Sequence, residues 1–207
     1  MNGIIISEFI SFIYDGTKKK ERKMDMKATG IVRRIDDLGR IVIPKEIRRT
    51  LRIRESDPLE IFTDREGEII LKKYSPIGEM TSFAKQYADS LAQVSGRIAL
   101  IADRDQFIAA AGGCKYLLGK SVSKALEQKM ENRENFIAAK AERGYVEVSE
   151  DLKKEEVAQI AVSPIICEGD IIGAVILAEG DEHKKMGEAE QKLTLAAAGF
   201  LGRQMEQ

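Results

Sequence analysis

Histidine and cysteine are scarce in this sequence, and their scarcity excludes several classes of protein. The 207 residues include one histidine, His183, and two cysteines, Cys114 and Cys167. A lone histidine without nearby ligand residues indicates a surface turn rather than a metal site, and a catalytic triad would need a nucleophile beside it. The cysteines lie in separate apolar contexts, which favours reduced thiols packed in a core over a disulfide framework. We therefore expect a cytoplasmic protein that is not an enzyme, with no catalytic residue and no metal site.

Long apolar runs are missing as well. No stretch reaches the ~18 apolar residues that a membrane-spanning helix needs. The N-terminal stretch MNGIIISEFISFIYDG is apolar, but it includes Glu8 and lacks the basic start and small-residue cleavage site of a secretion signal. We interpret residues 1–25 as an extension that is disordered or lies upstream of the natural start at Met24 or Met26. An amphipathic membrane contact is the alternative for this segment, but we expect no membrane partner.

The net charge of −1 hides an uneven distribution along the chain. Residues 26–75 hold 12 basic and 9 acidic side chains, whereas residues 76–207 hold 16 basic and 21 acidic ones. A chain of this length accommodates one full domain and a smaller module, so we place a domain boundary between residues 75 and 76. The first domain suits a polyanionic partner, and the second does not.

Residues 26–75 have the pattern of short strands. Two β-branched runs, residues 30–35 and 39–44, flank a turn signal that includes Asp37 and Gly39. Asp and Gly favour tight turns, and β-branched residues favour strands. The sequence therefore predicts two strands joined by a tight connection.

A short helix and a second hairpin complete this domain. Pro44 ends the second strand, and residues 45–51 follow with the spacing of a two-turn helix. Residues 59–74 then predict a hairpin. About fifty residues with so little helix bury too small a core, and their strand edges remain open to pairing. We therefore expect an obligate homodimer in which two copies pair their strands.

The second domain alternates helices with apolar strands. Pro76 and Gly78 predict a hinge ahead of it. Helices are predicted at residues 79–96, 121–133 and 188–205, and strands at residues 97–103, 106–112, 145–148, 158–166 and 171–178. This order indicates an antiparallel sheet covered by helices, with the first and last helices packed together. The last helix carries four residues small enough to admit a close neighbour: Ala196, Ala197, Gly199 and Gly202.

Basic residues gather in the first domain between residues 27 and 52. They are Lys27, Arg33, Arg34, Arg40, Lys45, Arg48, Arg49 and Arg52. A guanidinium group meets phosphate with two parallel donors and reads guanine in the major groove, so the arginines are candidates for DNA binding. The alternative is a solvated face with ion pairs to Asp36, Asp37 and Glu46. Charge alone leaves both readings open.

The segment GIVRRIDDLGRIVIPKEIRRTL, with its surroundings from residue 26 to 76, closely resembles the N-terminal domain of the AbrB family of bacterial transition-state regulators. The resemblance implies a swapped-hairpin β-barrel dimer that binds double-stranded DNA. It implies DNA contacts by Arg33, Arg40, Arg48 and Arg49, with Lys27 and Arg34 as supporting charges. Two departures from the family pattern are visible, because Arg52 and Ser56 stand where glycine is usual, but neither changes the arginine set.

The layout beyond this domain resembles sporulation regulators of the same family, whose second half is similar to a GAF domain. The matching stretches are LLGKSVSKALEQ and IICEGDIIGAVILAEGD. The expected fold class is α+β, with a GAF-like antiparallel sheet flanked by helices at residues 76–207. The resemblance implies an activator and repressor of sporulation genes in the forespore. It also implies an unidentified small-molecule effector, with no known cofactor. Pairing of the first and last helices between chains would join two DNA-binding dimers, so we expect a homotetramer.

Two other functions were weighed against this one. The stretch GGCKYLLGKS imitates a phosphate-binding loop, but five residues rather than four separate Gly113 from Gly119, so ATPase activity is not expected. Antitoxins use the same swapped-hairpin domain, and an autorepressor that binds a toxin through its C-terminal region is the alternative function. Antitoxins append a short flexible tail, whereas this appendage is patterned for folding.

Overall fold

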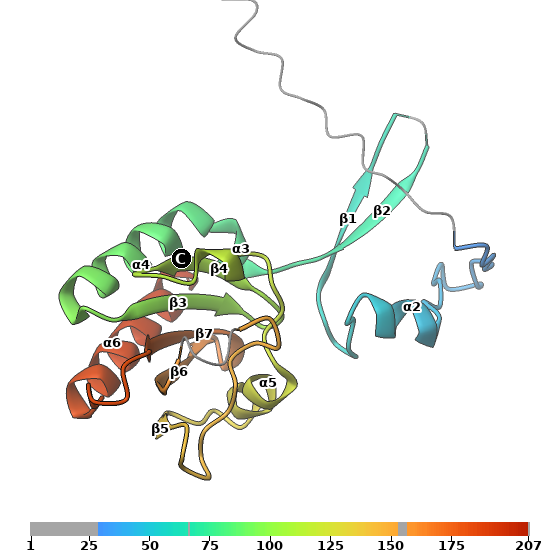
Figure 1. The fold of residues 1–207 in the computed structure, drawn as a ribbon. Helices are drawn as coiled ribbons and strands as arrows, with labels where there is room; N and C mark the ends of the chain where they lie inside the picture. Colours follow the sequence, from blue (N-terminus) through green and yellow to red (C-terminus); the bar gives the residue numbers. More distant parts are fainter. Residues whose placement is uncertain (1–28, 66, 153–156, 207) are drawn as a thin grey trace, which may run out of the picture. The chain divides into compact units, whose positions relative to one another are not determined.

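The computed structural model of the chain describes residues 29–65, 67–152 and 157–206 (Figure 1). Contacts within the chain divide it into two units, Met1–Pro44 and Lys45–Gln207. The extension predicted for residues 1–25 lies outside the described residues. The domain boundary predicted between residues 75 and 76 stays a prediction.

Residues 29–44 form a tight turn between two extended arms. The Gly39 amide donates to the Asp36 carbonyl at 3.0 Å, and the Asp36 amide donates to the Arg40 carbonyl at 3.0 Å, so the predicted turn is present. The two predicted strands are not formed as paired strands, because no described segment of this chain pairs with residues 30–35 or 39–44. A strand needs a neighbour for its backbone donors and acceptors, and a single copy supplies none here.

Helix α2 (Lys45–Thr50) starts directly after Pro44, as predicted. Strands β1 (Leu59–Thr63) and β2 (Ile69–Lys73) then form the predicted antiparallel hairpin, with Leu59 opposite Lys73 and Thr63 opposite Ile69. Large apolar side chains are exposed along both strands: Ile61, Phe62, Ile69 and Leu71. A two-stranded hairpin with exposed apolar side chains is marginal in water without further packing.

The C-terminal part is built on one five-stranded antiparallel sheet (Figure 1). The strands lie in the order β4-β3-β7-β6-β5 and span Ile98–Asp103 (β3), Phe107–Ala111 (β4), Phe136–Ala139 (β5), Gln159–Cys167 (β6) and Asp170–Glu179 (β7). The central strands β3, β6 and β7 are almost wholly buried, which explains their continuous apolar sequences.

Helices cover both faces of this sheet (Figure 1). Helices α4 (Thr81–Ser95) and α6 (Glu188–Gln204) pack on one face through Ala84, Ala88, Leu91, Ala197, Ala198 and Leu201. Helix α5 (Lys124–Glu131) and the 3₁₀ turn η1 (Lys115–Leu117) cover the other face with Leu117, Leu126 and Met130. The predicted sheet flanked by helices is confirmed.

Two local predictions for this part were wrong, and one strand was missed. The predicted hinge is a helical turn, α3 (Pro76–Glu79), because the Ser75 hydroxyl caps it and Pro76 suits a first helical position. Residues 145–148 form no strand, since the Val148 carbonyl accepts from the Ser123 amide at the start of α5 instead. Strand β5 was not predicted at all.

Helix α6 is fixed to the sheet by one buried polar pair and one close backbone approach. The hydroxyls of Ser163 and Thr194 lie 2.9 Å apart in the core. A Cβ atom at Gly202 would lie 2.1 Å from the Ile166 carbonyl oxygen, which confirms the predicted close neighbour at this position. At Gly199 the nearest atom is the flexible end of Arg203, at 3.6 Å. None of the helices in the described part of the chain is long and apolar enough to cross a membrane.

Candidate nucleic-acid interface

The turn at residues 36–40 holds an arginine in a defined position. The Asp36 carboxylate accepts hydrogen bonds from the Leu38 amide at 3.0 Å and the Arg40 amide at 2.7 Å through Oδ1. Its second oxygen, Oδ2, accepts from Arg40 Nε at 2.8 Å. The Arg40 amide and guanidinium donate to the charged form, which lowers the pKa of the Asp36 carboxyl below its usual range. The carboxylate is therefore ionised at neutral pH.

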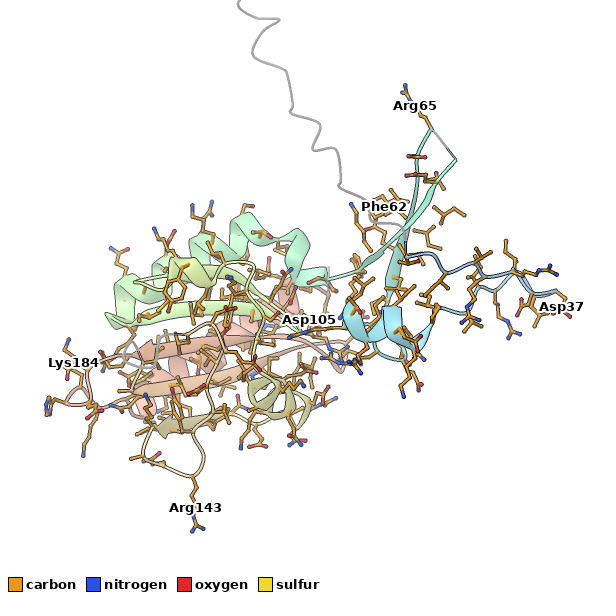
Figure 2. The ribbon with its side chains drawn as sticks, turned by 45° about the vertical axis from the view of Figure 1, so that its right-hand side comes forward. Asp37, Phe62, Arg65, Asp105, Arg143 and Lys184 are labelled. Atoms are coloured by element: carbon orange, nitrogen blue, oxygen red, sulfur yellow. The ribbon has the colours of Figure 1, made fainter. Side chains whose placement is uncertain are left out.

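Asp37 differs from Asp36 although the two are adjacent in the chain. Figure 2 shows Asp37 at the outer tip of the turn, and its side chain is exposed. No hydrogen bond or ion pair of its carboxylate is found among the residues that the structure describes. The ion pair that the sequence allowed for Asp36 is thus formed, whereas none is found for Asp37 in the described ranges.

Helix α2 presents Arg48 and Arg49 and ends in a left-handed residue. The Ile53 amide donates to the Arg48 carbonyl at 2.7 Å, and the Arg52 amide donates to the Arg49 carbonyl at 3.4 Å. This pair of bonds is a Schellman motif, which places Arg52 in the left-handed region with φ of 52°. These two hydrogen bonds fix the backbone of Arg48 and Arg49, both predicted DNA contacts, at the end of the helix.

The predicted DNA-contacting side chains are almost all open to solvent. Arg33, Arg34, Arg40 and Arg49 are exposed, and Arg48 is half-buried with its Nη1 atom 4.0 Å from the Glu55 carboxylate. For the guanidinium groups of Arg33, Arg34 and Arg49, no partner exists within the described ranges. The predicted supporting charge at Lys27 falls outside those ranges. Ion pairs with carboxylates are therefore present at Arg40 and Arg48, whereas none is found for Arg33, Arg34 and Arg49 among the described residues.

Exposed apolar side chains flank Arg33, Arg34 and Arg40 along the chain in residues 29–44. Val32 is 90% exposed and Val42 is 70% exposed, and Ile31, Ile35 and Ile41 are exposed as well. So many exposed large apolar side chains in one short segment indicate an interaction site. Unpaired backbone in the same segment offers a strand edge. Both features fit a second copy of the domain, as the sequence predicted.

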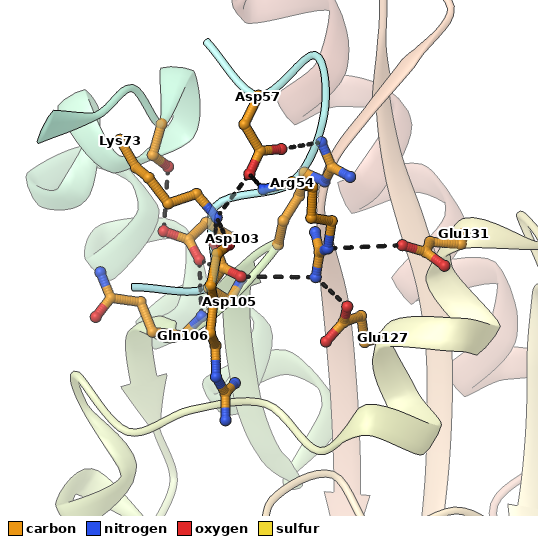
Figure 3. A network of polar contacts seen from close by, with 11 residues as sticks. Arg54, Asp57, Lys73, Asp103, Asp105, Gln106, Glu127 and Glu131 are labelled. Atoms are coloured by element: carbon orange, nitrogen blue, oxygen red, sulfur yellow. Dashed lines mark hydrogen bonds and ion pairs between the residues drawn. The ribbon is translucent and has the colours of Figure 1, made fainter. Parts of the chain in front are cut away.

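A network of ion pairs that the sequence did not predict lies within the Lys45–Gln207 unit (Figure 3). The Asp57 side chain, only 3% exposed, accepts from Lys73 Nζ at 3.2 Å and from Arg104 Nη1 at 3.2 Å. Burial alone would raise the pKa of the Asp57 carboxyl. Donation by the Arg54 amide and by Lys73, with the charge of Arg104, outweighs burial and lowers this pKa.

Arg54 is the second centre of the network (Figure 3). Its guanidinium pairs with Glu127, lies 3.7 Å from Asp105 and lies 4.0 Å from Glu131. Asp105 also pairs with Lys73, so both centres share one carboxylate. The partners are far apart in the chain and form no sequence motif, so these ion pairs could not be predicted from the sequence.

The remaining reactive side chains form no site in the described part of the chain. His183 is exposed in a turn, as predicted, and its amide donates to Asp181 at 2.9 Å. Cys114 and Cys167 are free thiols that are partly buried against the two cores. Within the described residues, no group of three acidic, histidine or cysteine side chains could hold a metal ion.

An aromatic cluster joins the outer sides of α4 and α6. The Tyr87 and Phe200 rings are stacked with centroids 5.5 Å apart, and Phe83 lies 6.0 Å from Phe200 and 6.2 Å from Tyr87. The predicted packing of the two helices is thus present. Phe200 remains 36% exposed, and Leu195 and Val94 of the same helices are exposed too.

Both halves of the chain are similar to known protein families. Residues 79–206 match the family model "Stage V sporulation protein T C-terminal, transcription factor", and residues 32–79 match "Antidote-toxin recognition MazE, bacterial antitoxin". Stage V sporulation protein T of Bacillus subtilis is 55% identical over 183 residues, which are 88% of this chain and 100% of that protein. The transition state regulatory protein AbrB of the same organism is 51% identical over 77 residues, which are 37% of this chain and 79% of that protein.

A solved structure supports the fold of the second half. The GAF domain from Acinetobacter phosphoenolpyruvate-protein phosphotransferase is 13% identical to this chain, with a TM-score of 0.50. The aligned region covers 61% of this chain and 81% of the chain of that structure. The likeness concerns the fold alone. The predicted α+β class, with an AbrB-type N-terminal domain and a GAF-like C-terminal domain, is confirmed. The antitoxin alternative is not favoured, since the MazE model matches only residues 32–79.

Proposed function

The chain belongs to the family of stage V sporulation protein T transcription factors, and we propose that its arginines grip operator DNA in the cytoplasm of the forespore. The proposed contacts are Arg33, Arg40, Arg48 and Arg49, with Lys27 and Arg34 as supporting charges. At some sporulation genes the protein activates transcription, and at others it represses. Its activity is regulatory, and no catalytic step belongs to it.

One observation supports this assignment above the others. In a unit with two carboxylates beside its arginines, Arg33 and Arg34 keep exposed guanidinium groups, and the Asp36 carboxylate engages only the Nε side of Arg40. Guanidinium groups left unpaired by the protein are available to phosphate or guanine. A homodimer presents the set twice, which suits the two-fold symmetry of a DNA duplex.

The direct test is binding of a duplex that the wild-type protein selects from a random pool. We expect Arg40→Ala to weaken binding by ~10- to 100-fold, because a good guanidinium–base or phosphate pair contributes ~1–3 kcal/mol. Lys85→Ala, on the exposed side of α4, is the matched control because it removes a charge outside the N-terminal domain. Equal affinity of the Arg40 and Lys85 variants would contradict the assignment.

Salt dependence tests the number of contacts. Four arginines in each of two copies give ~8 contacts, so the logarithm of affinity should fall with the logarithm of salt with a slope near −7. Each arginine replaced by alanine removes two contacts from the dimer and should reduce the steepness by ~1.8. A slope unaffected by Arg33→Ala would show that this residue makes no phosphate contact.

We also propose that the protein is a homotetramer, joined through the outer sides of α4 and α6. The support is the aromatic cluster of Phe83, Tyr87 and Phe200, together with exposed Leu195 and Val94 on the same two helices. Aromatic side chains with large exposed area are typical of interface centres. Phe200→Asp should halve the mass measured by light scattering, and an unchanged mass would contradict the proposal.

A small-molecule effector is the last part of the proposed function. A cavity of about 650 Å³ beside the Asp57–Lys73 pair supports it, since ligand pockets have volumes of this order. Arg133 lines the cavity and donates to the Gly169 carbonyl at 2.5 Å. In a thermal-shift screen of nucleotides, amino acids and carboxylic acids, the binding compound should raise the Tm of the wild type and not of Arg133→Ala. A screen without any such compound would count against this site.

A further inference from the structure

We propose that Asp36 is a positioning residue for DNA binding: it holds the Arg40 guanidinium by its Nε edge so that the two outer nitrogens face the duplex. The proposal rests on the proposed role of Arg40 and extends it to a side chain of opposite charge. Nothing in the charge pattern assigns Asp36 a part in binding a polyanion.

The geometry is specific to one edge of the guanidinium. Asp36 Oδ2 accepts from Arg40 Nε at 2.8 Å, and within the described part of the chain neither Nη1 nor Nη2 of Arg40 donates to this carboxylate. The Oδ1 atom is fixed by the Leu38 and Arg40 amides at 3.0 and 2.7 Å. The acceptor is therefore anchored to the backbone of the turn, and it orients the side chain of the residue that ends the turn.

Such an arrangement prepares the arginine for its target. A guanidinium has five N–H donors in a planar fork, and the Nη1 and Nη2 donors suit a phosphate or the O6 and N7 atoms of guanine. Holding Nε fixes the plane of the fork before DNA arrives, and less side-chain freedom is then lost on binding. The gain in affinity from the positioned Arg40 side chain thus outweighs the repulsion between the Asp36 carboxylate and the phosphates.

Folding alone does not account for the contact. The Arg40 side chain is 68% exposed and that of Asp36 is 36% exposed, and ion pairs in such surroundings contribute little to stability because solvent screens them. Asp37, one residue further on, carries the same charge into solvent without a carboxylate contact among the described residues. Asp37 therefore provides the matched control for charge without position.

Asp36→Asn should keep the hydrogen bonds of the turn and remove the hydrogen bond from Arg40 Nε. The amide oxygen of asparagine still accepts from the Leu38 and Arg40 amides, so the turn persists. The amide nitrogen that replaces Oδ2 is a donor and cannot accept from Arg40 Nε. Asp37→Asn removes the same charge and leaves the hold intact.

The two variants should differ in affinity although each removes one negative charge. On a duplex selected by the wild type, removal of a negative charge favours binding, so Asp37→Asn should bind equally well or up to ~3-fold more tightly. Asp36→Asn should bind ~10-fold more weakly despite the same gain in charge, because the fork is no longer pre-organised. Equal affinity of the two variants would overturn the proposal.

A double-mutant cycle tests whether Asp36 acts through Arg40. In an Arg40→Ala background there is no guanidinium to position, so Asp36→Asn should no longer weaken binding. A loss as large as in the wild-type background would show that Asp36 acts in another way. The ¹⁵Nε–¹Hε resonance of Arg40 should also move toward that of solvated arginines in Asp36→Asn, while the Leu38 amide keeps its shift. An unmoved Arg40 resonance would contradict the hold directly.

The same experiments keep this inference apart from the proposed function. If the wild type binds no duplex, or if Arg40→Ala binds as the wild type does, the proposed role of Arg40 fails first. If both of those results are as expected and the Asp36 and Asp37 variants still agree, only the positioning role fails.

Discussion

At Arg52 and Ser56 the backbone adopts φ values of +52° and +65°. For residues with a side chain, this left-handed conformation costs ~1–2 kcal/mol of conformational free energy, and for glycine it does not. The resemblance to the AbrB family implies glycine at these two positions, and glycine suits this conformation better than the arginine and serine present.

Glycine at either position should stabilise the protein. We expect Arg52→Gly and Ser56→Gly to raise the free energy of unfolding by ~0.5–1 kcal/mol each, because relief of the left-handed strain exceeds the added entropy of the unfolded chain. Arg52→Ala and Ser56→Ala are the controls, since alanine keeps the strain. Urea unfolding at one fixed protein concentration gives the comparison, and equal stability of the glycine and alanine variants would refute it.

Asp57 should make stability depend on pH. Its pKa is lowered in the folded state, so the ionised carboxylate stabilises the fold above the ordinary aspartate pKa of ~4 and the stabilisation disappears as the pH falls through the folded value. Asp57→Asn should cost ~1–3 kcal/mol at pH 7, because Lys73 and Arg104 lose a buried partner.

The cost of Asp57→Asn should shrink steadily below pH 4. Asp89→Asn, on the exposed side of α4, should change stability by less than ~0.5 kcal/mol at either pH. Urea denaturation at pH 7 and pH 3.5 measures both variants. A cost that is constant with pH would mean that the charge of Asp57 is not what matters.

At the scale of elements, the sequence predicts whatever a local pattern encodes. The apolar stripe of α4 gave the helix and its buried residues Ala84, Ala88 and Leu91, and the apolar runs gave β3, β4, β6 and β7. Strand β5 has only four residues, at the edge of the sheet, and its pattern is too short to read.

Long-range bonds explain the other errors. Residues 145–148 alternate like a strand, yet their carbonyls meet the start of α5, where Ser123 donates from its amide to Val148 and from its hydroxyl to Glu147. Which backbone groups meet across such a distance depends on the whole topology. A local period cannot report it.

The two glycines of α6 give a prediction at this scale. Gly202→Ala should destabilise by ~1–3 kcal/mol, since its Cβ would lie 2.1 Å from the Ile166 carbonyl oxygen and the helix would have to move. Gly199→Ala should stabilise by ~0.5–1 kcal/mol, because alanine suits a helix interior and the nearest atom is 3.6 Å away. Urea unfolding followed by circular dichroism decides between them, and the same sign for both variants would contradict the packing of α6.

For the molecule as a whole, the sequence predicted the kind of domain, an AbrB-type DNA-binding domain, better than the side-chain contacts within it. The arginine set was predicted because family resemblance preserves residue types at fixed positions, and its DNA contacts stay a prediction. The hold of Asp36 on Arg40 and the pairs around Arg54 were not found, because they depend on the orientation of side chains and on partners up to 77 residues apart, such as Glu131. The function of the family could therefore be predicted from the sequence, whereas the contacts of Asp36 and Arg54 could not.

Assembly gives the last prediction. Val42 is 70% exposed in a segment with unpaired backbone, and Phe200 is exposed on α6, so we expect two separate interfaces between copies. Val42→Asp and Phe200→Asp should each halve the mass in light scattering, since a buried charge without a partner disrupts an interface. The double variant should be a monomer.

DNA binding separates the two interfaces. Val42→Asp should abolish binding, because the arginine set is presented twice only when the N-terminal domains pair, while Phe200→Asp should retain binding by isolated dimers. Leu118→Asp, at an exposed apolar position of the GAF-like domain, is the control and should keep both mass and affinity. If Val42→Asp binds the selected duplex like the wild type, pairing of the N-terminal domains is not what brings the arginines together on DNA.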